Sequence, residues 1–295
     1  MGTDGTKSKV VDGNVAARLR IVTTLAPGAI AIAEPDGPPA VDGARSYALT
    51  TFGNLDERSE AIAKGLIEWG VRPGMRLVML VPFGAKFIEL VFALLKAGVV
   101  VVLVDPGMGR KHLIQCLSDA EPDGFVGVPK AQAIRAVLRG RFPKAKWNVT
   151  VGTRWFWGGK TLDQITAAGE AATDRIDLPR IERRDPAADI FTTGSTGPPK
   201  GVLYTHGTFH AQIDRIRERY DIHRGSRDLA CFPLFGLFDA VMGVTTIIPD
   251  MDPTRPAEVD PQRLVEAATQ WEVDQAFGSP ALWNTVVRWS KTCGQ

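Results

Sequence analysis

A short segment, residues 192–200, concentrates side chains that suit the binding of an anion. It contains four hydroxyls, two glycines and one lysine: Thr192, Thr193, Gly194, Ser195, Thr196, Gly197 and Lys200. Glycine lets backbone N–H groups approach a ligand closely because it has no Cβ. The hydroxyls add hydrogen-bond donors, and the lysine adds a compact positive charge. The segment predicts a loop that binds a polyphosphate; the alternative is an ordinary solvated turn rich in Ser and Gly.

The spacing of this loop differs from that of the phosphate loop of kinases and GTPases. That motif is Gly-x-x-x-x-Gly-Lys-Ser/Thr and opens directly into a helix. Here Gly194, Gly197 and Lys200 are spaced differently, and two prolines precede the lysine. Apolar, strand-like runs stand on both sides, at residues 189–191 and 202–204. We therefore expect a loop between two strands.

A helix is expected to follow the second of these strands, from about His206 to Tyr220. Its positive N-terminus and His206 would help to hold the loop near a nucleotide, and Thr205 would act as the N-cap. His206 and His210 are four residues apart and therefore lie on one helical face. A zinc site would need a third ligand, which none of the usual motifs supplies. We therefore expect no metal ligands in this chain.

A second segment, residues 231–239, is rich in aromatic side chains. Phe232, Phe235 and Phe238 surround Gly236, and a glycine among large rings favours a place where a chain or ligand passes close by. These four residues are the candidate walls of an apolar pocket. Ordinary core packing of the three rings is the alternative.

The rest of the sequence alternates between predicted strands and helices, which is typical of a parallel sheet with right-handed crossovers. Strands are expected at residues 76–81, 99–104, 125–128, 147–151, 190–193, 202–204, 227–232, 246–249 and 273–277. Helices are expected at residues 52–69, 86–97, 111–120, 131–139, 206–220, 237–244, 264–271 and 281–289. The predicted fold class is α/β, with mainly parallel sheets flanked by helices.

Two stretches are harder to interpret. Residues 87–104 are apolar enough to suggest a membrane span, but their character changes from Leu- and Ala-rich to a valine run at Gly98. A buried helix followed by a central parallel strand explains this change better, so no transmembrane segment is expected. Between Gly152 and Pro186 the pattern weakens, and Trp155, Phe156 and Trp157 are expected to cover the core rather than to form a binding surface.

Composition agrees with an ordinary globular enzyme domain. Of the 295 residues, 44% are hydrophobic and 23% are charged, and the net charge is +2. Such a balance does not indicate a nucleic-acid partner. The three cysteines lie far apart and read as reduced thiols, and the first residues lack the apolar run of a secretory signal. A cytoplasmic protein is expected.

Residues 192–201 resemble the signature phosphate loop of the adenylate-forming superfamily, which includes acyl-CoA synthetases, peptide-synthetase adenylation domains and luciferases. The run from Leu95 to Pro106 and the helix that follows Tyr47 resemble earlier motifs of that family, in the same order. The resemblance covers nearly the whole chain from about Ile21 onward. It implies ATP and Mg²⁺ as cofactors, with the metal bridged by the phosphates. It also implies that Lys200 is catalytic and that the loop residues and His206 bind the nucleotide.

The aromatic segment, together with the Asp- and Pro-rich residues 248–261, resembles one branch of that family: the OleC-type β-lactone synthetases of bacterial long-chain olefin biosynthesis. This implies activation of a long-chain 3-hydroxy fatty acid as an acyl-adenylate, followed by closure to a β-lactone with release of AMP. Other enzymes of the olefin pathway would then be partners to look for. Gly236 stands where acyl-CoA synthetases usually carry histidine, and Asp239 where many carry glycine. A fatty-acyl-CoA ligase, an acyl-AMP ligase and an inactive binding fragment are the alternatives.

The resemblance also predicts how the chain is organised. It implies a mobile segment at residues 1–20, a first α/β subdomain at 21–185, and the start of a second at 186–295 that carries the phosphate loop. The adenine-contacting segment, the Mg²⁺-binding glutamate and the small C-terminal domain of the family would all follow Gln295. We therefore expect residues 1–295 alone to bind ATP poorly and to form no acyl-adenylate.

Overall fold

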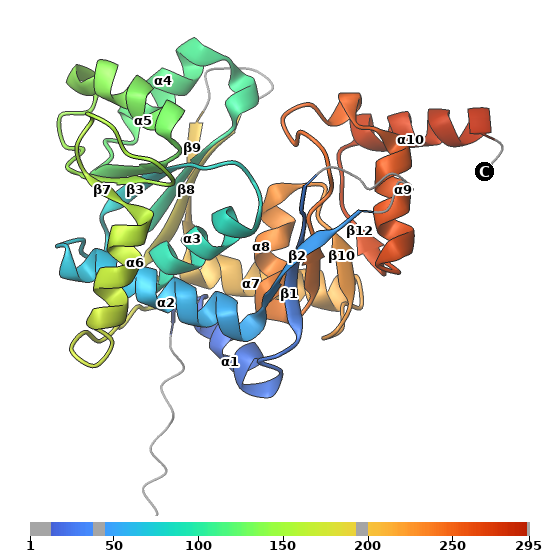
Figure 1. The fold of residues 1–295 in the computed structure, drawn as a ribbon, viewed down its shortest axis with the longest axis horizontal. Helices are drawn as coiled ribbons and strands as arrows, with labels where there is room; N and C mark the ends of the chain where they lie inside the picture. Colours follow the sequence, from blue (N-terminus) through green and yellow to red (C-terminus); the bar gives the residue numbers. More distant parts are fainter. Residues whose placement is uncertain (1–12, 38–44, 193–199, 294–295) are drawn as a thin grey trace, which may run out of the picture.

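The computed structural model describes residues 13–37, 45–192 and 200–293, which form two β-sheets with helices between and around them (Figure 1). The first sheet has seven strands in the order β7-β6-β5-β3-β4-β8-β9. They are β3 (Arg76–Leu80), β4 (Val100–Val104), β5 (Gly124–Gly127), β6 (Trp147–Thr150), β7 (Lys160–Thr161), β8 (Pro186–Thr192) and β9 (Lys200–Thr205). Neighbouring strands are parallel except for β8 and β9, which form an antiparallel hairpin.

The second sheet has five strands in the order β12-β10-β11-β1-β2. They are β1 (Ile30–Pro35), β2 (Tyr47–Thr51), β10 (Arg227–Leu229), β11 (Thr245–Ile247) and β12 (Gln275–Ala276). Only β1 and β2 are antiparallel to each other. The carboxyl ends of the parallel strands share one edge of each sheet, which is where α/β proteins place their ligands.

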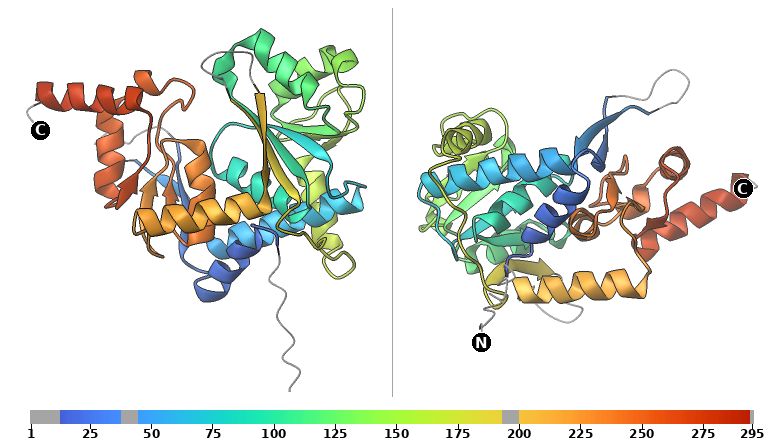
Figure 2. Two further views of the ribbon diagram at one scale, coloured as in Figure 1. Left: turned by 180° about the vertical axis from the view of Figure 1, so that it is seen from behind. Right: turned by 90° about the horizontal axis from the view of Figure 1, so that it is seen from below.

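The helices form layers that alternate with the sheets (Figures 1 and 2). A middle layer between the sheets contains α1 (Ala17–Leu25), α2 (Phe52–Glu68), α3 (Ala85–Lys96), α7 (His206–Arg219) and α8 (Pro233–Met242), and α6 (Leu162–Ala171) packs on α2. The outer face of the first sheet is covered by α4 (Arg110–Asp119) and α5 (Pro129–Val137). The outer face of the second is covered by α9 (Pro261–Gln270) and α10 (Pro280–Cys293). Short 3₁₀ turns are η1 (Pro106–Met108), η2 (Arg139–Arg141) and η3 (Pro256–Glu258).

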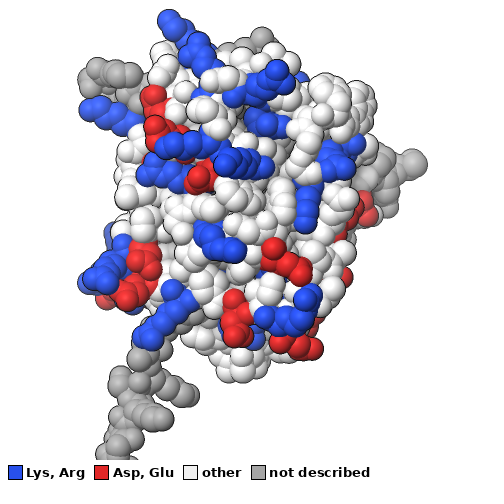
Figure 3. All heavy atoms as spheres, turned by 90° about the vertical axis from the view of Figure 1, so that its left-hand side faces the viewer, with Lys and Arg blue, Asp and Glu red and all other residues white. Residues whose placement is uncertain are grey.

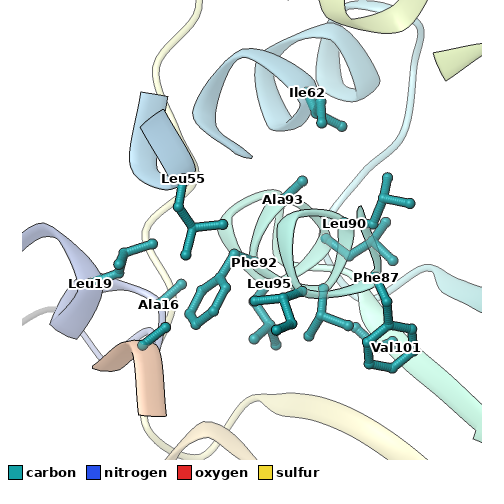
Figure 4. Close-up of a cluster of buried hydrophobic side chains, with 14 of the residues drawn as sticks. Ala16, Leu19, Leu55, Ile62, Phe87, Leu90, Phe92, Ala93, Leu95 and Val101 are labelled. Carbon is teal, nitrogen blue, oxygen red and sulfur yellow. The ribbon is translucent and has the colours of Figure 1, made fainter. Parts of the chain in front are cut away.

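Helix α3 lies at the centre of the middle layer, and every residue from Phe87 to Lys96 is buried. Its side chains pack against α1 and α2 on one side and against the valine-rich strand β4 on the other (Figure 4). The prediction of a buried helix and a central strand at residues 87–104 is therefore confirmed. Among the described residues, no helix combines the length and the apolar character needed to cross a membrane.

Most predicted elements are present within one to four residues of the predicted ends, and the fold class is confirmed. Five elements were not predicted, because their hydrophobic patterns are short or interrupted by small residues: α1, α6, β1, β2 and β7. Helix α6 begins inside the stretch where the pattern weakened, at a capping box in which Thr161 and Gln164 bond each other's backbone N–H groups.

The two sheets do not follow the predicted division at residues 185 and 186. Strands β8 and β9, from the second half of the chain, complete the first sheet, while β1 and β2 from the first half complete the second. A mobile segment was expected at residues 1–20. For residues 13–20 the structure differs from this expectation, because Asn14, Val15 and Leu19 are buried. Residues 1–12 lie outside the described part of the chain.

Candidate functional site

The predicted phosphate loop connects the two strands of the β8–β9 hairpin. Thr193, Gly194, Ser195, Thr196 and Gly197 lie outside the described residues, and for Thr192 the structure describes the backbone alone. Thr192 is paired with Lys200 at the loop end of the hairpin, and Lys200 is exposed. The two strands expected on either side of the loop are therefore confirmed.

The base of the hairpin is tightly packed around Gly201. A Cβ at this position would lie 2.5 Å from Oδ1 of Asp189 and 2.8 Å from the ring of Phe191. Asp189 is buried, and this burial raises the pKa of its carboxyl, although the charge of Arg76 opposes the shift. Glycine next to Lys200 thus lets a buried carboxyl and an aromatic ring support the strand that carries the lysine.

Asp105 and its neighbours lie beside the start of the loop. The Asp105 N–H donates to the Phe191 carbonyl at 3.4 Å, which joins the end of β4 to the end of β8. The Asp105 side chain accepts a hydrogen bond from the Gly107 N–H at 2.8 Å and so caps the turn η1. The Asp-Pro step that resembles an early family motif therefore stands at the same sheet edge as the phosphate loop.

The two histidines of α7 hold the N-terminal segment of the chain. The Val15 N–H donates to Nδ1 of His206 at 3.2 Å, and Nε of Arg18 donates to Nδ1 of His210 at 2.8 Å. Nε2 of His210 lies 3.1 Å from the Gly13 carbonyl, and Arg18 also forms an ion pair with Asp214. Because both Nδ1 atoms accept hydrogen bonds, both rings are neutral with the proton on Nε2. We call this set of contacts the histidine clamp.

His206 lies at the first turn of α7 and is fully buried. Burial lowers the pKa of His206 to about 4, with the neighbouring His210 adding to the shift. Thr205 caps the helix through a 3.1 Å bond from the Thr208 N–H, so the predicted N-cap is confirmed. The structure places His206 just after Thr205, at the end of the hairpin opposite Lys200 and the predicted loop, and gives its ring no surface toward solvent. Its predicted contact with a nucleotide stays a prediction.

The three predicted aromatic residues do lie together, and Phe277 joins them. Phe277 stacks on Phe235 at 3.9 Å between centroids and meets Phe232 at 6.0 Å. Phe235 contacts Phe238 at 6.3 Å, and Phe238 contacts Phe209 of α7 at 5.9 Å. Phe209 in turn stacks on Tyr204 of β9. These six rings form a continuous row, the aromatic row, that runs from α8 to the hairpin.

The end of this row that reaches the hairpin, Tyr204 and Phe209, was not predicted from the sequence. Tyr204 and Phe209 were assigned to a strand and a helix, but a contact between those elements carries no local signal. The aromatic row borders a small apolar cavity of about 40 Å³ between α3, α7 and α8, which Phe209, Leu237 and Phe238 help to line. An apolar chain could therefore enter between α7 and α8 only if these side chains moved apart.

Gly236 lies against the second sheet rather than beside open space. A Cβ there would lie 3.0 Å from Cζ of Phe83, 3.2 Å from Cγ2 of Thr246 and 3.4 Å from Cβ of Ala230. Phe83 separates this position from a larger, partly polar cavity of about 200 Å³ that Glu34, Arg45 and Asp250 also line. The glycine thus allows α8 to approach the sheet closely, and its predicted place in the pocket wall depends on the position of the Phe83 ring.

Two buried carboxyl groups lie beneath the aromatic row. Asp228 of β10 and Asp239 of α8 are both buried and hydrogen-bonded to each other. The Thr246 hydroxyl lies 3.2 Å from Oδ2 of Asp239 and 3.4 Å from the Gly236 carbonyl. Burial raises the pKa of Asp228 to about 6, and burial together with the neighbouring Asp228 raises the pKa of Asp239 well above its ordinary value. Asp239 stood out in the sequence, but its partner Asp228 lies eleven residues earlier on a separate strand.

Comparison with known proteins identifies the class to which this fold and hairpin belong. The chain is a member of the AMP-binding enzyme family, whose family model matches residues 29–294. It is 45% identical over 283 residues to an olefin β-lactone synthetase of Xanthomonas campestris, in an alignment that covers 96% of this chain and 50% of that protein. An olefin β-lactone synthetase of Stenotrophomonas maltophilia is also 45% identical, over 282 residues that cover 93% of this chain and 50% of the relative.

Solved structures show the same fold. A long-chain-fatty-acid–CoA ligase from Archaeoglobus fulgidus superposes with a TM-score of 0.78 at 19% sequence identity, over 95% of this chain and 54% of that one. At this level of identity the likeness concerns the fold alone. The chain spans about half the length of the curated relatives that it matches.

Proposed function

We propose that the intact protein uses ATP to activate a long-chain 3-hydroxy fatty acid and then converts the product to a β-lactone. The observation that carries this proposal is the 45% identity to two olefin β-lactone synthetases across at least 93% of the chain. The geometry agrees with it, since an exposed lysine stands at the loop end of the β8–β9 hairpin and an aromatic row leads from Tyr204, toward the other end of that hairpin, to α8.

In the first step, a carboxylate oxygen of the fatty acid attacks the α-phosphorus of ATP. The bond from this phosphorus to the bridging oxygen breaks, and pyrophosphate leaves with the added negative charge. Lys200, together with the hydroxyls of the loop, would stabilise that charge at a preorganised position. Mg²⁺ that accompanies ATP would neutralise further charge. The described residues contain no cluster of three metal-ligating side chains.

In the second step, the oxygen of the substrate's own 3-hydroxyl attacks the activated carbonyl carbon. The bond from this carbon to AMP breaks, the hydroxyl proton passes to a base or to solvent, and a four-membered lactone results. Coenzyme A takes no part. The aromatic row is the proposed surface for the acyl chain, with Phe232, 40% exposed, at its outer end.

The experiment that tests this proposal combines the intact protein with ATP, Mg²⁺ and a 3-hydroxy fatty acid, with and without coenzyme A. We expect β-lactone and AMP to form without coenzyme A, as detected by mass spectrometry. The matching fatty acid without a 3-hydroxyl is the control, and it should give pyrophosphate but no lactone. A thioester formed only with coenzyme A would identify a CoA ligase, and accumulating acyl-adenylate would identify an acyl-AMP ligase. No reaction at all would indicate a binding protein.

A further inference from the structure

One stretch of the chain, from Pro129 to Lys160, contains no acidic residue. It holds eight Lys and Arg residues and no Asp or Glu. The whole chain has 35 basic and 33 acidic residues, so the remainder has 27 basic and 33 acidic residues and carries a net charge of −6. The nearly balanced charge of the whole protein therefore conceals a strongly basic segment beside an acidic remainder.

This segment lies on one side of the molecule. It comprises α5, η2, β6 and the loop that leads to β7, at the edge of the first sheet. Six of its basic side chains are exposed: Lys130, Arg139, Arg141, Lys144, Lys146 and Arg154. An ion pair with Glu121 occupies Lys144. Figure 3 shows this side of the molecule, where Lys and Arg outnumber Asp and Glu over the upper part.

Large apolar side chains are exposed among these charges. Ile134 and Val137 of α5 are 52% and 82% exposed, and Trp155 and Phe156 in the loop are 69% and 79% exposed. Exposed rings and aliphatic side chains of this size are costly on a surface that meets only water. The predicted role of the loop aromatics as a cover for the core is thus fulfilled only by Trp157, which is buried.

Trp157 fixes the loop to α5. Its indole N–H donates to the Thr150 hydroxyl at 3.0 Å, and its carbonyl accepts a 2.9 Å bond from the buried Arg135 of α5. Trp155 stacks on the Trp157 ring and Phe156 meets it edge-on. The loop therefore presents two outward aromatic side chains from a rigid support beside the basic helix. We call α5, η2 and this loop the basic aromatic face.

We propose that the basic aromatic face docks on an anionic lipid surface. Lys and Arg are attracted to acidic headgroups, and Trp, Phe and aliphatic side chains insert at the boundary between headgroups and acyl chains. The exposed Ile134 and Val137 favour a lipid surface over a nucleic acid as the partner. Aliphatic side chains gain free energy in an acyl layer but offer neither stacking nor hydrogen bonds to bases.

The position of the face is consistent with delivery of a lipid to the hairpin. The loop after β6 and the loop after β8 both leave the carboxyl edge of the first sheet, because these strands are parallel. Four strand spacings separate β6 from β8, a distance of roughly 19 Å at about 4.8 Å per strand. A membrane that contacts Trp155 and Phe156 therefore lies along the same edge as Lys200.

Vesicle co-sedimentation of the intact protein, without ATP, tests this proposal. The vesicles are phosphatidylcholine alone and an equal mixture of phosphatidylcholine and phosphatidylglycerol, each at low and high salt. Two variants remove the face in different ways: W155A/F156A removes the rings, and R139E/R141E reverses two charges. The matched control is R215E/Y220A on α7 and its end, where Arg215 and Tyr220 are 82% and 65% exposed. Melting curves establish that all three variants are folded.

We expect the protein to bind the mixed vesicles and not the neutral ones, with binding that weakens as salt shortens the screening length. Each face variant should lower the bound fraction at least about tenfold, while the control stays within about twofold. Equal binding to both vesicle types, or face variants that bind like the control, would overturn the proposal. Tighter binding to a single-stranded oligonucleotide than to vesicles, lost in the same variants, would also overturn it in favour of a nucleic-acid surface.

Discussion

Lys200 stands at the first position of β9, exposed, opposite Thr192. We expect K200A in the intact protein to lower the rate of pyrophosphate release by roughly 10²–10³, the usual scale for removing one preorganised charge stabiliser. The loss should fall on kcat rather than on the affinity for the carboxylate, since charge develops on the pyrophosphate only in the transition state. R215A, on an exposed surface of α7, serves as the control. An unchanged rate in K200A would remove this residue from the mechanism.

His206 should make the fold sensitive to acid. Its pKa is about 4 in the folded protein and near 6.5 in the unfolded chain, so between these values the unfolded state binds more protons. The stability that neutral His206 provides is therefore complete above pH 6.5 and is lost as the pH falls toward 4. We expect the advantage of the wild type over H206N in free energy of unfolding to shrink by about 2 kcal/mol between pH 7.5 and pH 5.

Urea titrations at the two pH values measure this change. Asparagine retains an acceptor near the position of Nδ1 but does not titrate, so it isolates the effect of protonation. The control is H223N, because His223 lies on the surface. A wild-type advantage that stays constant with pH would show that protonation of His206 does not open the histidine clamp.

The buried carboxyl pair Asp228 and Asp239 lies between α8 and the second sheet. It should make the folded protein less stable as the pH rises, which is opposite to the effect of His206. The pKa of Asp228 is about 6 in the folded protein, above its unfolded value of 3.8, so the folded state binds more protons. Its favourable contribution is present below pH 3.8 and is lost as the pH rises through 6. We expect the free energy of unfolding of D228N, relative to that of the wild type, to increase by about 1–2 kcal/mol between pH 4 and pH 7.5. Thermal melting at both pH values tests this, with D260N at the exposed start of α9 as the control.

The contact of α8 with the second sheet also decides the outcome of changes at Gly236. The structure places this position against Phe83, Thr246 and Ala230. We expect G236A to cost about 1–2 kcal/mol of stability and G236W considerably more, because a well-packed core resists added volume. Activity should then fall equally for long and short 3-hydroxy acids. A selective loss for long acids would instead show that Phe83 moves aside and that Gly236 borders the acyl chain.

Elements with a strong local pattern were predictable from the sequence. The amphipathic helix α2, the apolar helix α3 and the valine-rich β4 each carry a period or a composition that identifies them. The strands β8 and β9 were predictable from the apolar runs on either side of the predicted phosphate loop. What could not be predicted depends on partners far along the chain. His206 binds Val15 across 191 positions, and Gly201 is needed because Asp189 and Phe191 approach it from the neighbouring strand.

At the scale of the whole molecule, the two sheets exchange strands between the halves of the chain. The first sheet needs β8 and β9, and the second needs β1 and β2. We therefore expect the segments 21–185 and 186–295, produced separately, to lack cooperative thermal unfolding, and to recover it when produced together. Circular dichroism melts compare the separate and combined segments with the unbroken chain. Two separate segments that each melt cooperatively would support independent subdomains at the predicted boundary.

Because β1 pairs with β11, one edge of β1 lacks its partner until β11 has been synthesised on the ribosome. Ile32 pairs with Thr246, and between their appearances 213 other residues must be made. At about 5–20 residues per second, this takes roughly 10 to 40 s. Throughout that interval the β1–β2 hairpin has one edge with no partner, a known site for unwanted strand addition. We therefore expect the nascent β1–β2 hairpin to be prone to aggregation until β11 is made, and a change in the rate of translation before Thr246 to change the aggregated fraction of the protein.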